Sequence, residues 1–240
     1  MSSIINLSLF LLFAIWSVEL DPNYAYAWTY LGFTYWIDGV YYHMYYDRKE
    51  WLERAAKMAE KALSINDKSS DAYALLSAVY LPQGKYDEAV TAGKKAISLD
   101  PNSSENHAIV AITMQNVGDG EAVVALIKQS MRLDPYFPPW YWYRMGIGYR
   151  LLGRYEESAK ALKKRVDIAE KANKPNMGIY LSLATTYSMM GRVEEARAAV
   201  AKALEVNPKL TIESWCKSQL YKDPKEIEKI HDALSIAGLQ

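Results

Sequence analysis

Two pairs of neighbouring carboxylates are the residues in this chain that could most readily do chemistry. Glu156 lies beside Glu157, and Glu194 lies beside Glu195. Such a pair can supply a general acid and a general base. Each pair also opens a helical pattern that follows a glycine, where negative charge interacts favourably with the helix dipole. The sequence therefore predicts a structural role for both pairs rather than a catalytic one.

The histidines and the cysteine form no recognisable metal or nucleophile motif. His43, His107 and His231 lie far apart in the sequence and have no metal-ligand spacing. Cys216 is the single cysteine, so neither an intrachain disulfide nor a thiolate zinc site can form. Glycine-rich phosphate loops and a GxSxG elbow are also missing from the sequence. We therefore expect no catalytic residues, no metal and no cofactor.

The composition restricts the class of partner. The 240 residues include 28 Lys and Arg and 28 Asp and Glu, which gives a net charge of zero. Nucleic acid is not an expected partner, because the chain has no basic excess. Half of the residues are apolar, with nineteen Tyr and seven Trp that crowd into residues 24–51 and 136–149. Most of these aromatic side chains are expected to pack in a core, which leaves a smaller set to contact a partner.

Pairs of helices must position these side chains. Apolar residues recur at helical spacing from Pro139 to Leu152 and again from Tyr155 to Ala172. Gly153 separates the two stretches, and glycine accepts the left-handed backbone that ends a helix. One such hairpin cannot bury its own apolar face, so it needs copies of itself on either side.

The copies recur along the chain. Asp100-Pro101 and Asp134-Pro135 both end helices, and 34 residues separate the two prolines. The turn sequences GKYDEA, GRYEES and GRVEEA begin at Gly84, Gly153 and Gly191. With these motifs in register, the sequence resembles a tetratricopeptide repeat (TPR) array over nearly its whole length.

The resemblance implies an all-α fold, a right-handed helical solenoid of about five TPR units. The expected parts are an N-terminal half-repeat helix at 1–20, an array at 21–208 with repeats at 24–66, 69–100, 103–134, 138–172 and 177–207, and a C-terminal helical cap at 209–240. Within the cap we expect one helix over 210–221 and another that begins at Pro224, with Asp223 as its N-cap.

Two segments are similar to a narrower group. PPWYWYRMGIGYRLLGRYEES, and a tail with a KDP turn and a closing AGL, look like TPR regions that follow bacterial class III adenylate or guanylate cyclase domains. The match covers about residues 20–240 and contains no cyclase catalytic domain. It implies a bacterial sensory or regulatory module rather than an enzyme.

In TPR arrays the first helix of each repeat lines a concave groove, so the resemblance also implies which residues face a ligand. The implied groove residues are Tyr26, Thr29, Phe33, Trp36, Gln115, Trp140, Tyr143, Arg144 and Arg150. Such a groove suits an extended protein or peptide segment with apolar side chains, and a carboxylate for Arg144 or Arg150. The alternative is that the aromatic residues pack in the core and the arginines are solvated.

Residues 4–20 are apolar at nearly every position. A buried helix, a signal peptide and a membrane span are the alternatives. The first three residues carry no positive charge and no cleavage site is evident, and Ile4–Val18 is shorter than the roughly 20 residues that a span needs. We therefore favour burial, with cytoplasmic and exported locations both open.

The acceptor for this helix is expected to be a second subunit, which predicts a homo-oligomer. The residues expected to associate are Leu9, Phe10, Leu12, Phe13, Trp16 and Trp215. Contact with the far end of another subunit gives a head-to-tail ring or filament, whereas helix-to-helix contact gives a symmetric dimer. A membrane surface that takes the same face through residues 4–18 is the competing explanation.

One further segment departs from the repeat pattern. Gly39–Tyr46 is longer and more aromatic than a standard TPR turn. Exposed aromatic loops are a liability unless they bind something, so we expect this segment to make a contact of its own.

Overall fold

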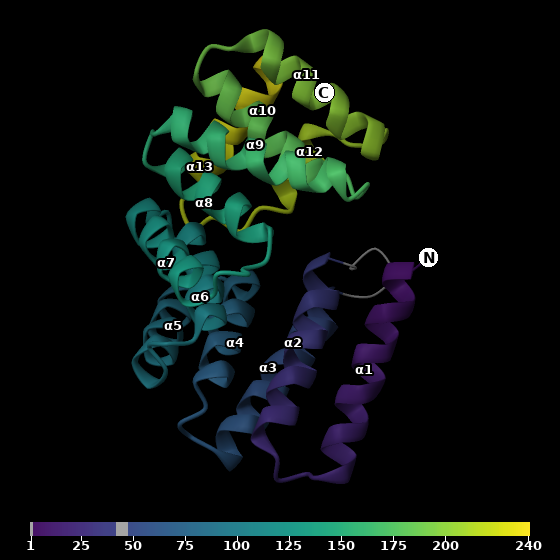
Figure 1. Ribbon diagram of the computed structural model, residues 1–240, viewed down its shortest axis with the longest axis vertical. Helices are drawn as coiled ribbons and strands as arrows, with labels where there is room; N and C mark the ends of the chain where they lie inside the picture. Colours follow the sequence, from purple (N-terminus) through teal and green to yellow (C-terminus); the bar gives the residue numbers. More distant parts are fainter. Residues whose placement is uncertain (1, 42–47) are drawn as a thin grey trace. The chain divides into compact units, whose positions relative to one another are not determined.

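The computed structural model describes residues 2–41 and 48–240. These residues form thirteen α-helices and one 3-10 turn, and no strand lies among them (Figure 1). The all-α fold expected from the sequence is therefore confirmed. The chain forms two compact units, Met1–Thr113 and Met114–Gln240.

Unit 1 consists of successive helical hairpins. Its elements are α1 (Ser2–Leu20), α2 (Ala25–Tyr41), α3 (Arg48–Ile65), α4 (Ser70–Tyr80), the 3-10 turn η1 (Leu81–Gln83), α5 (Tyr86–Leu99) and most of α6 (Ser104–Asn116). Helices α2 and α3 pack together, as do α4 and α5. The hydroxyls of Ser77 on α4 and Thr113 on α6 lie 2.6 Å apart in the buried interior. Successive first helices therefore meet through a polar contact as well as through apolar ones.

Unit 2 repeats the hairpins and adds two helices. Its elements are the end of α6, α7 (Gly120–Leu133), α8 (Trp140–Leu151), α9 (Tyr155–Lys171), α10 (Met177–Met189), α11 (Val193–Val206), α12 (Ile212–Lys217) and α13 (Pro224–Ile236). One core joins α9, α10, α11 and α13, with Leu162, Leu181 and Leu234 fully buried. Helix α13 lies against α10 and α11 (Figure 1).

The turns form as the sequence predicts. Gly153 and Gly191 have left-handed backbones, with φ of 71° and 73°, which is the conformation that glycine adopts without strain. Both carboxylate pairs lie in the first turns of their helices, α9 and α11. Glu157 pairs with Arg154 and Glu195 with Arg192. The expected position of both pairs at the start of a helix is confirmed.

Helix α2 continues through Gly39 as far as Tyr41, although the sequence predicted that Gly39 would begin an extended turn. Gly39 lies where α2 and α3 approach each other closely. A Cβ at this position would be only 3.2 Å from Leu52 Cγ and Trp51 Cβ on α3. The glycine therefore serves a close helix–helix approach and not a turn. The remainder of the expected aromatic insertion, Tyr42–Tyr46 with His43, lies outside the described residues.

The helix expected over 210–221 is wrong in its second half. Helix α12 ends at Lys217 after only six residues. Ser218 and Gln219 turn their side chains back to the carbonyl of Trp215, which satisfies an acceptor at the helix end. Residues 218–223 then form a non-helical stretch that leads into α13.

Over residues 11–20, where its side chains are described, helix α1 is covered on one face. Val18 is buried against Ala27 and Leu31 of α2, with Leu11 and Ile15 beside it. Away from this contact the side chains are exposed: Leu12, Phe13, Trp16 and Leu20 are between 59% and 74% exposed. The side chains of Leu9 and Phe10 lie outside the described part. None of the helices, over the residues described, has the length and apolar content for crossing a membrane.

Candidate functional site

Unit 1 carries a row of aromatic side chains at the start of α2 and along it that we call the aromatic ladder: Tyr24, Tyr26, Tyr30, Phe33 and Trp36. Each ring contacts the next, with centroids 5.8, 4.4, 6.3 and 6.4 Å apart in chain order. The three tyrosines remain 41–51% exposed. The exposed part of the row is therefore its three tyrosines, and a group of neighbouring exposed aromatic rings of this kind is typical of a binding face.

The structure separates the implied groove residues of α2 into two groups. Tyr26 is exposed and Trp36 is half-buried, so both belong to the accessible surface. Phe33 packs in the core of unit 1. Thr29 is fully buried, and its hydroxyl donates to the carbonyl of Ala25 at 3.1 Å. Tyr30 was not predicted from the repeat positions, although it lies one helical turn after Tyr26 and extends the same row.

Two carboxylates lie close to the aromatic ladder. Burial raises the pKa of Tyr30, with a hydrogen bond to Tyr26 and the charges of Glu105 and Asp71 adding to the effect. Desolvation and the charge of Asp71 raise the pKa of Glu105. Asp71 accepts a hydrogen bond from Asn106 Nδ2 at 2.9 Å. Neither carboxylate forms an ion pair with a described Lys or Arg, so this end of the ladder is acidic and open to a cation.

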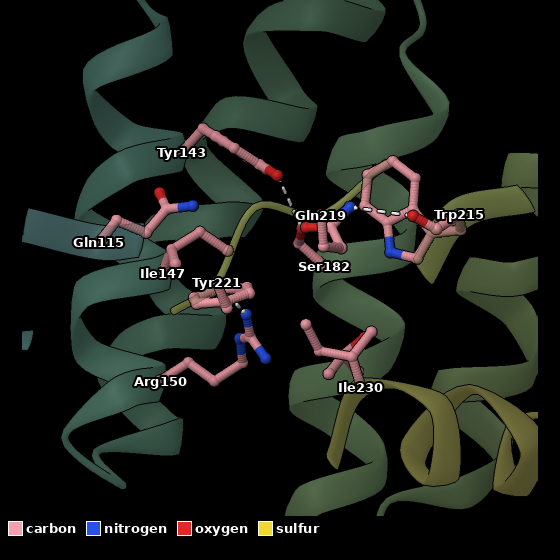
Figure 2. Close-up of a pocket in the computed structure, with 10 residues that line it drawn as sticks. Gln115, Tyr143, Ile147, Arg150, Ser182, Trp215, Gln219, Tyr221 and Ile230 are labelled. Carbon is pink, nitrogen blue, oxygen red and sulfur yellow. Dashed lines mark hydrogen bonds between the residues drawn. The ribbon is translucent and has the colours of Figure 1, made fainter. Parts of the chain in front are cut away.

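Unit 2 contains a small polar cavity of about 10 Å³. Its lining comes from the first helices and from the chain after the last repeat (Figure 2): Gln115, Tyr143, Ile147, Arg150, Ser182, Thr185, Trp215, Gln219, Tyr221 and Ile230. Ser182 donates a hydrogen bond to the hydroxyl of Tyr143 at 3.2 Å, which links α10 to α8. The volume is that of about one water molecule, because the chain itself fills the rest of this face.

The filling element is the stretch Ser218–Asp223, which we call the closing segment. Tyr221 is only 6% exposed, and its hydroxyl accepts a hydrogen bond from Arg150 Nη2 at 3.1 Å (Figure 2). The backbone N–H of Lys222 donates to the carbonyl of Asn116 at 2.7 Å. Burial also raises the pKa of the Tyr221 phenol. The closing segment therefore occupies the face of unit 2 that the TPR resemblance implied for a ligand.

Two guanidinium groups lie beneath the closing segment, and neither is paired with a carboxylate of the described residues. Arg150 is 6% exposed, and the Nε atoms of Arg150 and Arg144 are buried without a hydrogen-bond partner in this part of the chain. Arg144 Nη1 donates to Gln115 Oε1 at 2.8 Å, so its described side-chain hydrogen bond is to a neutral amide. Buried charges are normally paired with an opposite charge. Guanidinium groups in this setting could bind a carboxylate, with which arginine often forms two hydrogen bonds at once.

The implied groove residues of unit 2 mostly converge on this cavity. Gln115, Tyr143 and Arg150 line it, and Arg144 contacts it through Gln115. Trp140 is not part of the lining and lies edge-on to Tyr141, with centroids 4.5 Å apart. Tyr221 was missed, because it follows the last repeat and no repeat position predicts its contacts. The signal available was a single aromatic residue in a short stretch before Pro224.

Two observations concern metal-binding and thiol groups among the described residues. His, Cys, Asp and Glu side chains there form no cluster of three or more that could hold a metal ion. Burial raises the pKa of the Cys216 thiol, which favours the unreactive protonated form. The arrangement on both units is suited to binding chain segments through aromatic rings and charges.

Comparison with protein families gives the class of protein. Models of the tetratricopeptide repeat match residues 58–91 and 178–210. The first match runs from the second half of α3 through α4 into α5, and the second covers nearly all of α10 and the whole of α11. The chain therefore contains tetratricopeptide repeats, in agreement with the sequence prediction. No curated protein sequence matches the chain.

Solved TPR structures show the same fold. The Cut9 and Hcn1 hetero-tetramer of the APC/C matches 98% of this chain and 44% of its own, at 15% identity and a TM-score of 0.65. TTC0263, a thermophilic TPR protein from Thermus thermophilus, matches 83% and 99%, at 21% identity and a TM-score of 0.56. YrrB, described as a TPR protein with an unusual peptide-binding site, matches 82% and 93%, at 16% identity and a TM-score of 0.53. The fold is thus that of a TPR α-solenoid, and these low identities carry no function with them.

Proposed function

We propose that this protein is a non-catalytic scaffold that binds a protein or peptide along the aromatic ladder of unit 1. The observation that carries the proposal is the exposure of three tyrosines in mutual contact, each more than 40% exposed. Single exposed apolar residues are ordinary, but a contiguous aromatic row on one helix face marks an interaction site. YrrB supports the proposal to the extent that a TPR fold can carry a peptide-binding site.

The charges beside the ladder define the chemistry of the partner. Asp71 and Glu105 present two carboxylates that no described cation pairs with, and Glu105 gains from any cation that relieves their repulsion. A lysine or arginine side chain can also lie over the face of a tyrosine ring. The partner is therefore an extended segment that combines apolar side chains with a basic one.

A peptide-binding measurement tests this proposal. The probe is a labelled hexapeptide that alternates leucine with lysine, and its charge-reversed control alternates leucine with glutamate. We expect Tyr30→Ala and Glu105→Gln each to weaken binding of the lysine peptide about threefold to tenfold, which is the range expected for losing one cation–π or charge contact. Tyr136→Ala is the matched control, because Tyr136 is 95% exposed and lies outside the ladder. Equal binding of both peptides, or an equal loss in the control variant, contradicts the proposal.

A second candidate function is self-association through α1. The exposed side chains of Leu12, Phe13, Trp16 and Leu20 follow helical spacing and include no charge, so two copies can meet without repulsion between like charges. We commit to a second copy of this chain as the occupant. Four apolar side chains stabilise the contact by ~6–12 kcal/mol if fully buried. Association costs ~4–15 kcal/mol, so assembly depends on protein concentration.

Light scattering over a range of protein concentrations tests this candidate. The expected result is a dimer or larger particle that dissociates in the Phe13→Ser, Trp16→Ser double variant. The control is Tyr136→Ser, which removes an aromatic residue outside α1 that is 95% exposed, more than Phe13 or Trp16. A wild-type protein that stays monomeric at every concentration overturns this candidate. Particles that persist in the double variant assign assembly to another surface.

The resemblance to cyclase-associated TPR regions supports a third role, as a regulatory module of a signalling protein. It rests on the sequence of α8 and of the tail alone. Copurification with a cyclase encoded beside the gene is the expected result, and a gene neighbourhood without signalling enzymes counts against it.

A further inference from the structure

We propose that the face of unit 2 is a second peptide site, selective for an acidic side chain, and that the closing segment occupies this site in place of the ligand. The inference concerns residues on α8, α10 and the tail, and so it holds or fails independently of the aromatic ladder. It explains three features together: the placement of Tyr221, the guanidinium groups of Arg144 and Arg150, whose Nε atoms are buried and which form no ion pair with a described carboxylate, and the residual polar cavity.

The closing segment is held as a bound peptide is held. It belongs neither to α12 nor to α13, and it contacts the first helices through an inserted ring and a backbone hydrogen bond. Tyr221 is that ring, enclosed between Ile147 and Arg150 (Figure 2). The N–H of Lys222, bonded to the carbonyl of Asn116, is the backbone contact. An anchor side chain with adjoining main-chain bonds is the usual way in which an extended peptide is recognised.

Tyr221 is a poor match for the charge of the site. Arg150 and Arg144 bring two positive charges to it, and the phenol that accepts a hydrogen bond from Arg150 is neutral. The Nε atoms of both arginines find no acceptor among the described residues. A carboxylate at the position of the phenol oxygen can accept two parallel hydrogen bonds from one guanidinium and neutralise part of the charge. The geometry thus favours glutamate or aspartate over the residue that the chain itself supplies.

The cavity provides room and polarity for such a group. Its volume of about 10 Å³ is enough for one water, and its lining includes the hydroxyl of Ser182 and the amide of Gln115 (Figure 2). Removing the ring of Tyr221 would enlarge this space and leave its polar walls in place. An acidic side chain could then enter without any change in the first helices.

The closing segment can leave while its neighbours stay folded. Helix α13 is anchored by Leu234, which is fully buried in a core that also includes Tyr221. The N–H of Ile212 donates to the carbonyl of Gln240 at 3.0 Å, which ties the start of α12 to the tail. Tethering at both ends gives the segment a high effective concentration at its site, in the millimolar range for short linkers. An external peptide therefore binds with an affinity reduced by the fraction of molecules in which the site is open.

Hydrogen exchange on the wild-type full-length protein gives the first test. If the segment opens locally, the amide of Lys222 exchanges at least about tenfold faster than the amide of Leu234 in α13. Exchange of both amides at the same rate, through unfolding of the whole unit, would show that the segment is a fixed part of the core. That result overturns the proposal without any variant.

Peptide binding to the full-length protein gives the second test. The probes are two labelled hexapeptides, one with the sequence of Ser218–Asp223 and one in which that sequence carries Tyr221→Glu. We expect the protein variant Tyr221→Ala to bind the glutamate peptide at least about tenfold more tightly than the wild type does, and more tightly than it binds the tyrosine peptide. Adding Arg150→Gln should remove this gain, and added salt should reduce it.

The controls separate this inference from the proposed function. Tyr30→Ala in unit 1 should leave binding of the glutamate peptide unchanged, and circular dichroism checks that each variant keeps its helices. If the folded Tyr221→Ala variant binds neither peptide, or still prefers the glutamate peptide after Arg150→Gln, the site is not one in which these arginines select an acidic side chain. Neither result affects the peptide-binding test of the aromatic ladder in unit 1, which is judged separately.

Discussion

In each unit, the first helices of the repeats form one face of the same helical fold. The two faces differ in their charge and in how far they are exposed. The face of unit 1 is open, aromatic and acidic, with Tyr26 and Tyr30 exposed beside Glu105. The face of unit 2 is basic and is covered by Tyr221 from the same chain. Both units are built of helical hairpins, so the difference arises elsewhere. It comes from side chains outside the packing positions, and from residues after the last repeat.

The largest expected effect on stability concerns α13, the helix that follows the closing segment of unit 2. Leu234→Ala should lower the free energy of unfolding by about 2–5 kcal/mol, because Leu234 is fully buried and its truncation leaves a cavity. Urea denaturation followed by circular dichroism measures the change. Ile236→Ala is the matched control on the same helix, since Ile236 is 51% exposed, and it should change stability by less than about 0.5 kcal/mol. Equal losses of stability in the two variants would show that the burial of Leu234 does not anchor α13 in unit 2.

A smaller effect on stability should distinguish Tyr221 of unit 2 from Tyr30 of unit 1. Tyr221→Phe removes the acceptor of the hydrogen bond from buried Arg150 and should cost about 1–3 kcal/mol. Tyr30→Phe removes the hydroxyl of a side chain that is 41% exposed and hydrogen-bonded to Tyr26, and should cost less, about 0.5–1 kcal/mol. Thermal unfolding of both variants provides the measurement. A Tyr221→Phe variant as stable as the wild type would mean that the phenol makes no net contribution to closing unit 2.

The smallest effect is a pH dependence in unit 1. Desolvation and the charge of Asp71 hold the pKa of Glu105 above its ordinary value. The folded state therefore binds a proton more tightly than the unfolded state does, and the contribution of Glu105 to stability falls as pH rises through this raised pKa. Glu105→Gln should accordingly be slightly more stable than the wild type at pH 7, with the difference gone near pH 4. Denaturation midpoints at the two values test this, with Glu213→Gln as an exposed control. A difference that grows toward low pH contradicts the expected sign.

The sequence predicted most of the helices, because the rules that place them are local. Gly153 and Gly191 end helices for steric reasons that involve only their own backbones. Gly39 shows the limit of such rules. A glycine in the middle of a helix permits close packing as readily as it permits a turn, and only the position of α3 decides between the two.

The candidate sites were predicted less completely, because they depend on contacts between distant parts of the chain. Repeat positions identified Tyr26, Tyr143 and Arg150 as facing a ligand, and these three lie on the two faces that the structure reveals. They gave no indication that Tyr221 covers Arg150. The partner of Lys222 is the carbonyl of Asn116, and no local pattern links a backbone amide to an acceptor so far away in the sequence.

The bond between Lys222 and Asn116 also sets an order of events during synthesis. Residues of unit 1 leave the ribosome first and form a compact unit of their own. Unit 2 cannot cover its buried arginines until Tyr221 has emerged, which at usual elongation rates takes on the order of 5–20 s after Asn116. During that interval the nascent chain presents a basic, uncovered surface.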